Sequence, residues 1–362
     1  MAIPEFRGHQ SIRAETARAL AAGRLPQVLL VCGEPGVGKQ RFALWLAELA
    51  LCDNPSGEPC GACRPCRLVR ALGHPDLHWF VPVPRPKAGD PDRQVAEVRE
   101  AIGEVLAARR ENPIYSPPDG MSIHGIAAAR LILTTAALTT VEGGRRVIII
   151  GDADRLVSQD ASPEAANALL KFLEEPAASA LIVLTTTEPT RVLPTIRSRA
   201  VPVRLGRLSD ADIDDALRAM APTLSPDERR RRVATAEGSI GRALDATGAT
   251  PKQAEAAQLL SAAAQDTARF ERALKQAPWQ ARGDFSALLD ALAQALREAI
   301  RGITTPELGA KVPEPLSAVR EPGRLLAALS HVEAARDRAR GNVNPQLLLA
   351  SLTGELAEAL WA

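Results

Sequence analysis

A glycine-rich loop between an apolar run and a helical run constrains this chain more than any other feature. The loop reads GEPGVGKQ over residues 33–40 and follows the apolar run LPQVLLVC at 25–32. The helical pattern FALWLAELAL comes almost directly after it. A strand, a glycine loop and a helix in this order are typical of a phosphate-binding loop, where backbone N–H groups and the positive end of the helix face phosphate oxygens. We therefore expect an α/β fold with a parallel sheet.

The loop fits the pattern G-x-x-x-x-G-K-[ST] at every position except the last. The glycines Gly33, Gly36 and Gly38 would let the backbone approach phosphates closely. Lys39 would reach the β- and γ-phosphates of ATP. Gln40 stands where a hydroxyl normally ligates Mg²⁺, and its neutral, longer amide is not an equivalent ligand. The pattern predicts the loop geometry and leaves open whether ATP and Mg²⁺ bind.

Two further runs, RVIII at 146–150 and ALIVLTT at 180–186, have the composition of buried strands. The second magnesium ligand should be an acid that closes such a strand, but Gly151 holds the position after the first run. Asp152 is then either the water-activating acid, a metal carboxylate displaced by one residue, or a helix cap. Thr186 ends the second run and is a further candidate for nucleotide contact.

A cluster of cysteines follows the first helical run with the spacing C-x₇-C-x₂-C-x₂-C. Four thiolates this close together can surround Zn²⁺ tetrahedrally. A redox role would need one C-x₂-C pair in a thioredoxin-like setting, so we favour structural zinc. The expected ligands are Cys52, Cys60, Cys63 and Cys66.

The net charge and the N-terminal residues limit where the protein is expected to act and which partners it is expected to attract. The chain has 44 basic and 43 acidic residues, so no global field draws it to DNA or to a membrane. No apolar run approaches the length of a membrane span, and MAIPEFRGHQ lacks the apolar core of a signal peptide. We therefore expect a cytoplasmic protein whose thiols stay reduced.

The organisation of the chain follows from its breaks in pattern. Pro-rich text around a helical stretch at 93–110 is expected to form a surface excursion. Three short helices are expected over 209–246, and the remainder to residue 362 is Ala- and Leu-rich helical text. The expected parts are a core at 1–206, with a zinc module at 51–73 and the excursion at 81–122, a helical lid at 207–248 and a helical C-terminal domain at 249–362.

Two arginine features are candidates for contacts with neighbours. Arg199, in PTIRSRA at 194–200, lies where an arginine can be offered to a nucleotide on an adjacent subunit. The run Arg229–Arg232 is read as a solvated helix face, with a phosphate-backbone contact as the alternative.

Several of these segments together resemble a known family. They are GHQSIRAETARAL, LPQVLLVCGEPGVGK, the cysteine cluster, NALLKFLEEP at 167–176, TTTEPTRVLPTIRSRA at 185–200 and EGSIGRAL at 237–244. They are similar to bacterial DNA polymerase III clamp-loader subunits of the AAA+ class, over about residues 1–245 apart from the Pro-rich text. The resemblance implies an AAA+ P-loop core, a helical lid and an all-α collar through which subunits assemble.

Two types of subunit share this layout. The gamma/tau type carries a complete phosphate loop, Asp-Glu after the strand and G-S-x-R in the lid. The delta-prime type has an eroded nucleotide site and keeps the S-R-x arginine. This chain has Gln40, Gly151 and the lid sequence G-S-I-G-R, which places Arg242 one residue late. It therefore resembles the delta-prime type, although Ala200 replaces the usual cysteine after the arginine.

The resemblance implies a subunit that hydrolyses little or no ATP, supplies Arg199 in trans and assembles with gamma/tau and delta subunits. The complex would place a sliding clamp on primed DNA. A gamma/tau-type ATPase is the first alternative. A stand-alone P-loop phosphotransferase is an alternative of another class, although no segment resembles a pocket for a small substrate.

Overall fold

The computed structural model describes residues 3–111, 122–142, 144–156, 164–245, 251–264, 282–304, 314–339 and 343–361. The chain forms two compact units. The first comprises Met1–Pro118 and Ser122–Leu244, and the second contains Asp245–Ala362. The predicted division of the first unit into a core and a separate lid stays a prediction.

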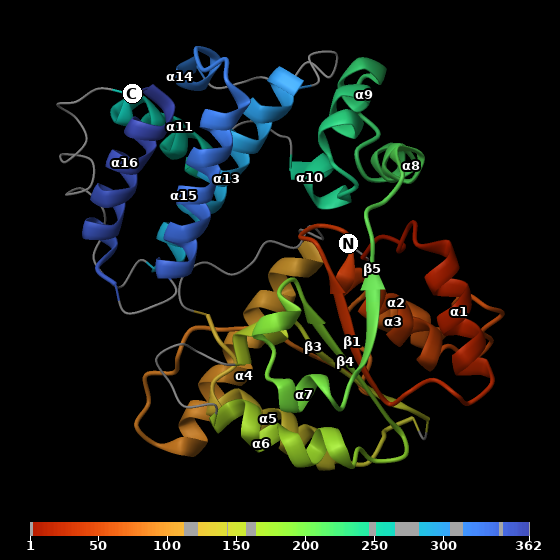
Figure 1. Ribbon diagram of the computed structural model, residues 1–362. Coiled ribbons are helices and arrows are strands. Elements are labelled where there is room, and N and C mark those ends of the chain that lie inside the picture. The colour runs from red at the N-terminus through yellow and green to blue at the C-terminus, as the bar shows by residue number, and fades with distance from the viewer. Residues whose placement is uncertain are drawn as a thin grey trace. The chain divides into compact units, whose positions relative to one another are not determined.

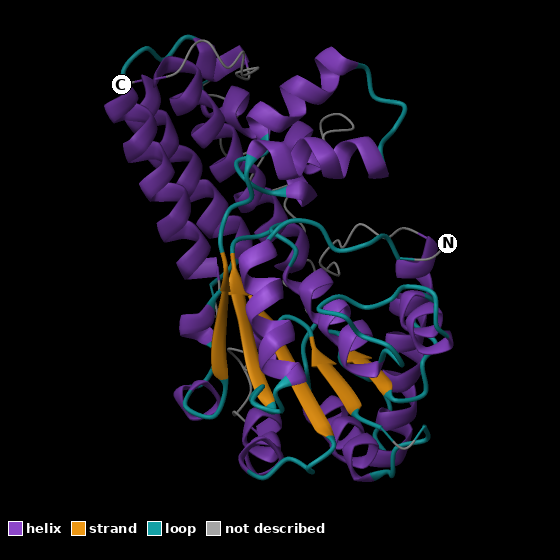
Figure 2. Cartoon of the chain, turned by 90° about the vertical axis from the view of Figure 1, so that its right-hand side faces the viewer, coloured by secondary structure: helices purple, strands orange, loops and turns teal. Residues whose placement is uncertain are grey.

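A five-stranded parallel sheet flanked by helices organises the first unit (Figures 1 and 2). The order across the sheet is β2-β3-β4-β1-β5, so the phosphate loop emerges beside the fourth strand in chain order. Leu30 of the first strand pairs with Leu184 on one side and with Pro202 on the other. The strands are β1 (Val28–Gly33), β2 (Leu77–Phe80), β3 (Arg146–Ile150), β4 (Ala180–Thr186) and β5 (Val201–Leu205).

The three runs predicted as strands are the central strands of the sheet, β3, β4 and β1. Strands β3 and β4 are buried at every residue, because a parallel sheet is covered by helices on both faces. The sequence analysis did not predict β2 or β5. Strand β5 contains Pro202 and is largely exposed, and an edge strand tolerates proline since it lacks one neighbour.

The helices that the sequence analysis bounded in the first unit are present near their predicted limits, since the stretch expected at 93–110 is helix α4. The three short helices expected over 209–246 are present, and the backbone N–H groups of Asp212 and Glu228 donate to the capping hydroxyls of Ser209 and Ser225. The helices are α1 (Gln10–Ala21), α2 (Lys39–Leu51), α3 (Arg64–Arg70), α4 (Pro91–Glu111), α5 (Ile126–Ala137), α6 (Glu164–Glu174), α7 (Pro194–Arg197), α8 (Asp210–Met220), α9 (Pro226–Thr235) and α10 (Ile240–Asp245), with short 3₁₀ turns η1 (Ala153–Leu156) and η2 (Pro189–Arg191).

The described part of the expected surface excursion at 81–122 is exposed or half-buried over most of its length, but one side of it is attached to the core. Helix α4 packs against α5, and Val98 and Ile102 belong to the hydrophobic core of the unit. Val83 also forms an isolated β-bridge with Ile123. The amphipathic spacing of α4 supplies an apolar stripe, so one face of this helix packs against the core while the opposite face stays exposed. Residues 112–121 lie outside the described residues.

The second unit is helical throughout its described residues, as predicted. Its core consists mainly of Leu and Ala side chains, and helix α13 packs against both α11 and α15. The helices are α11 (Pro251–Ala263), α13 (Arg282–Thr304), α14 (Glu314–Ser317), α15 (Pro322–Ala339) and α16 (Pro345–Trp361). Among the described helices of either unit, none is both long and apolar enough to cross a membrane.

Candidate nucleotide site and metal centre

The predicted phosphate loop connects the end of β1 to the start of α2. Gly36 and Gly38 have φ values of 77° and 99°, which residues with a side chain rarely adopt. Gly38 is the N-cap of α2, so the positive end of this helix faces the loop. The structure therefore has the backbone shape of the predicted loop.

Lys39 is bonded to the loop itself. Its Nζ donates to the carbonyl oxygens of Gly33 at 2.9 Å and of Glu34 at 2.8 Å. Burial lowers the pKa of Lys39 to about 8, against the opposing attraction of Asp152 and Asp154. An incoming phosphate would have to compete with these two carbonyl groups for the ammonium.

Gln40 lies where the metal-binding hydroxyl would be, and its amide has partners on both sides. The Nε2 group donates to Asp152 Oδ1 at 3.3 Å, and Oε1 accepts from Arg109 Nη1 at 3.2 Å. A Cβ atom on Gly151 would lie 3.2 Å from Gln40 Nε2. The missing side chain at Gly151 thus leaves room for the Gln40 amide.

Arg109 was not predicted as a site residue, because it lies at the end of α4 in the Pro-rich segment. Its side chain is buried, with 7% of the residue exposed. Its guanidinium carbon lies 4.2 Å from the centre of the Trp79 ring, a cation–π distance. Burial and then the nearby charge of Arg109 lower the pKa of Arg41 to about 10. Nothing in the local sequence around Arg109 indicates this placement.

The start of α10, in the segment predicted as a lid, packs directly on the glycine-rich loop. The Gly241 N–H donates to the Gly36 carbonyl oxygen at 3.1 Å, and a Cβ atom on Gly241 would lie 2.9 Å from Gly36 Cα. A side chain at this position would therefore collide with the loop backbone. The Arg242 guanidinium forms an ion pair with Glu237 of the same lid. Gly241 holds the position at which G-S-x-R has its arginine, and its close contact with the loop leaves no room for a side chain there.

The polar residues that follow β3 and β4 bond to one another. The Asp152 N–H donates to Thr185 Oγ1 at 3.2 Å, and the Thr186 hydroxyl donates to Asp154 Oδ1 at 2.6 Å. The Asp152 carboxylate binds the Gln40 amide, while its main-chain carbonyl begins η1. The roles of Asp152, Thr186 and Arg242 in nucleotide binding stay predictions.

The four cysteines converge at the other end of α2. Their Sγ atoms all lie within 4.8 Å of one another. Two of the Sγ–Sγ distances are 4.0 Å, between Cys60 and Cys66, and 3.9 Å, between Cys63 and Cys52. Four sulfurs placed about 2.3 Å from one zinc ion are separated by about 3.8 Å, so the cluster fits this metal.

Backbone amides around the cluster favour thiolates. The N–H groups of Cys60 and Cys63 donate to Cys52 Sγ and Cys60 Sγ, respectively. Hydrogen bonds from the backbone of Cys63 and Ala62 lower the pKa of the Cys60 thiol to about 6. Burial raises the pKa of the Cys66 thiol, which is completely buried at the start of α3. A divalent cation would compensate the charge of the buried sulfur.

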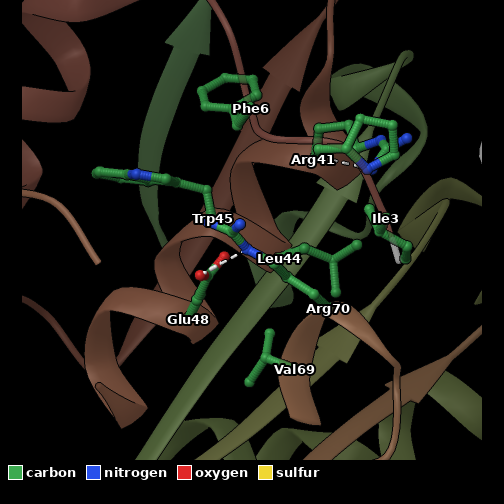
Figure 3. Close-up of a pocket in the computed structure, with 9 residues that line it drawn as sticks. Ile3, Phe6, Arg41, Leu44, Trp45, Glu48, Val69 and Arg70 are labelled. Carbon is green, nitrogen blue, oxygen red and sulfur yellow. Dashed lines mark hydrogen bonds and ion pairs between the residues drawn. The ribbon is translucent and has the colours of Figure 1, made fainter. Parts of the chain in front are cut away.

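The cysteine cluster is anchored to the core by polar contacts from α2. Trp45 Nε1 donates to Glu58 Oε2 at 2.7 Å, and Arg70 Nε donates to Glu48 Oε1 at 2.9 Å. Figure 3 shows the second contact beside a small cavity that Val69 also lines. These contacts hold α3 on α2, so the loop that carries the cysteines is fixed at both ends.

The two arginine features of the sequence differ in their surroundings. Arg199 follows α7, forms an ion pair with Glu174 of α6 and donates to the Thr195 carbonyl at 2.6 Å. Its side chain is 29% exposed. Each arginine of Arg229–Arg232 pairs with an acidic residue of α8 or α9. Arg230 and Arg231 are exposed, as expected for a solvated helix face, whereas Arg232 is buried and its Nη1 donates to the Ala243 carbonyl oxygen at 3.4 Å.

A family model matches more than half of the chain. The model describes the DNA polymerase III delta subunit, and the match covers residues 8–209. These residues include the phosphate loop, the cysteine cluster and Arg199.

Curated relatives agree with this match. The chain is 31% identical to DNA polymerase III subunit delta' of Bacillus subtilis (strain 168), over 54% of the chain and 46% of the relative. It is 34% identical to subunit delta' of Pseudomonas aeruginosa, over 48% and 40%. It is 29% identical to subunit gamma/tau of Mycobacterium tuberculosis, over 54% and 27%. The chain thus spans less than half the length of these relatives. From the match to the family model, the chain belongs to the DNA polymerase III delta subunit family of clamp-loader proteins.

Proposed function

We propose that this chain is a delta-prime-type assembly subunit of a DNA polymerase III clamp loader, with a degenerate ATP site of its own. It would act in the cytoplasm with gamma/tau and delta subunits to load a sliding clamp on primed DNA. The observation that carries the proposal is the Gln40 amide, which lies against Gly151 and bonds Arg109 and Asp152 where a working site holds magnesium. An AAA+ core, a lid at 207–248 and an oligomerisation domain at 249–362 belong to the same proposal.

The chemical contribution of this subunit would be Arg199. An arginine presented by one subunit neutralises the charge that develops on the γ-phosphate bound by its neighbour. The ion pair with Glu174 supports this role, since it restricts the guanidinium while leaving part of it exposed. On binding a neighbour, the guanidinium would exchange Glu174 for phosphate oxygens.

The cysteine cluster would hold a structural zinc ion. Cys52 lies at the end of α2, while Cys63 and Cys66 lie at the start of α3. One ion bound by these residues and Cys60 would join the two helix ends with four protein ligands and no open position, which is typical of structural zinc.

The test of the function is a loader reconstituted with gamma/tau and delta subunits. Arg199→Ala should lower DNA-stimulated ATP hydrolysis at the neighbouring site by about 10³-fold, as for other arginine fingers, and should leave assembly intact. Arg197→Ala is a matched control, because Arg197 is an exposed arginine at the end of α7, two residues before Arg199. Unchanged turnover with Arg199→Ala would remove the arginine from this role.

The gamma/tau-type ATPase is tested with the isolated chain. The degenerate site should give no steady-state ATP hydrolysis above background, even with clamp and primed DNA. Robust hydrolysis that is abolished by Lys39→Ala would favour a motor subunit over the assembly subunit.

A further inference from the structure

We propose that Arg109 is the built-in cation of the degenerate nucleotide site, so that its guanidinium takes the place of Mg²⁺ and closes the site to divalent metals. This assignment rests on the proposed function above, because it concerns the same site. It adds a residue from outside every nucleotide motif and explains how the altered motif residues fit together.

The residues that would ligate magnesium do not fit the ion. A working phosphate loop offers a hydroxyl after the lysine and a carboxylate at the end of the neighbouring strand. Here the first position carries the Gln40 amide and the second carries Gly151. The amide fills the space between them, since a Cβ on Gly151 would already lie 3.2–3.3 Å from its nitrogen and oxygen atoms.

The Gln40 amide lies between a positive and a negative side chain, with its oxygen toward Arg109 and its nitrogen toward Asp152. Its oxygen accepts from Arg109 Nη1 at 3.2 Å, and its nitrogen donates to Asp152 Oδ1 at 3.3 Å. A magnesium ion would need oxygen ligands and would repel the guanidinium that already binds the amide oxygen. Gln40 therefore links a resident positive charge to the carboxylate that follows β3.

The guanidinium is held in place by the core. Arg109 is 93% buried by area and lies 4.2 Å from the ring centre of Trp79, which is itself buried on β2. Helix α4 delivers the side chain, and the apolar residues Val98 and Ile102 fix this helix in the core. An arginine that is packed over an aromatic ring and keeps its charge at all physiological pH values is a permanent substitute for a dissociable ion.

The experiment uses the full chain loaded with zinc and titrates Mn²⁺, as a probe for Mg²⁺, by electron paramagnetic resonance with ATP present. The wild-type chain should take up no Mn²⁺ at this site. Arg109→Met keeps most of the side-chain length and removes the charge, so Gln40 Oε1 and the Asp152 carboxylate become available to a metal. This variant should bind Mn²⁺ with an affinity at least about tenfold above the limit at which uptake by the wild type would be detected, and its unfolding temperature should rise with added Mn²⁺. Arg110→Met is the matched control, because Arg110 is the exposed neighbour on α4, and it should behave as wild type.

Two outcomes overturn the assignment. One is Mn²⁺ uptake by the wild-type chain that Asp152→Asn abolishes. The other is a folded Arg109→Met chain that takes up no more Mn²⁺ than wild type. If Arg109→Met does not fold, Gln40→Thr provides the test. It restores the hydroxyl beside an intact guanidinium and should still exclude Mn²⁺, so uptake by this variant also overturns the assignment. No loader partner is needed, so a failure of Arg199 to act in trans would leave these results unchanged.

Discussion

The phosphate loop and the cysteine cluster lie at the two ends of helix α2, because Gly38 is its N-cap residue and Cys52 is its C-cap residue. At the C-terminal end, the four sulfurs come from neighbouring residues and converge within 4.8 Å. At the N-terminal end, the loop has its expected backbone shape, but its surroundings come from distant parts of the chain. Arg109, Asp152 and Gly241 are brought to it by α4, the end of β3 and the lid. The grouping of the sulfurs therefore depends on a local sequence motif. The residues that surround the loop depend instead on how distant segments of the chain pack.

The largest expected effect is that of zinc removal from the cysteine cluster. Structural zinc contributes on the order of 10 kcal/mol to the folding of small zinc modules, so chelation should unfold the loop between α2 and α3 and lower the unfolding temperature. Metal analysis should find one zinc per chain in the wild type and none in Cys63→Ser. Cys32→Ala is the control, because Cys32 lies in β1 outside the cluster and the variant should keep its zinc. Stably folded wild-type chain without metal would contradict the prediction, because it would show that the cysteine cluster folds without zinc.

The contact between lid and loop gives the next largest effect. In Gly241→Ala the new methyl group meets the Gly36 backbone at 2.9 Å, so one of the two segments must move. Overpacking of this kind costs about 1–3 kcal/mol, partly offset by the roughly 1 kcal/mol that alanine gains over glycine in a helix. Denaturant unfolding should show a net loss, and amide hydrogen exchange should become faster in residues 33–38.

The matched control for the lid contact is Gly206→Ala, because nothing lies within 4 Å of an added Cβ at Gly206. Its free energy of unfolding should stay within about 0.5 kcal/mol of wild type. Equal effects of the two substitutions would mean that the lid does not depend on its contact with the loop.

The effect of Lys39 on stability depends on pH. Burial lowers its pKa from 10.5 to about 8, so the unfolded chain binds more protons than the folded chain between these values. The stability of the wild type relative to Lys39→Met should therefore rise as pH increases from 8 to 10.5, by at most about 1.4 kcal/mol per pH unit. Denaturant unfolding over this range measures the difference, with Lys171→Met as control since Lys171 is exposed on α6. A pH-independent difference would mean that Lys39 is not buried as a charge in the loop.

The features that could be predicted from the sequence depend on a few neighbouring residues, as the cysteine cluster does. The features that could not be predicted depend on packing between distant segments, as the surroundings of the loop do. The apolar runs of β1, β3 and β4 and the C-x₂-C spacing act over a few residues, so the sequence predicted the central strands and the grouping of the cysteines. Strand β5 escaped prediction because an exposed edge strand with Pro202 has no alternating pattern. Arg109 escaped because its meaning depends on the packing of α4 against the core, and the Pro-rich text on either side of α4 suggested a surface segment.

The smallest expected effect comes from Gly151→Ala, which probes how firmly the Gln40 amide is held. The new methyl group would lie 3.2–3.4 Å from the amide atoms, a tight contact that a flexible side chain can relieve by moving a few tenths of an ångström. We expect a loss of less than about 1 kcal/mol in the free energy of unfolding, since no backbone atom of another segment is displaced. A larger loss would show that Arg109 and Asp152 hold the amide rigidly from both sides, and it should then disappear in the background of Gln40→Ala. A double-mutant cycle between Gly151→Ala and Gln40→Ala measures this coupling directly, because the two residues are in contact and their effects should not add.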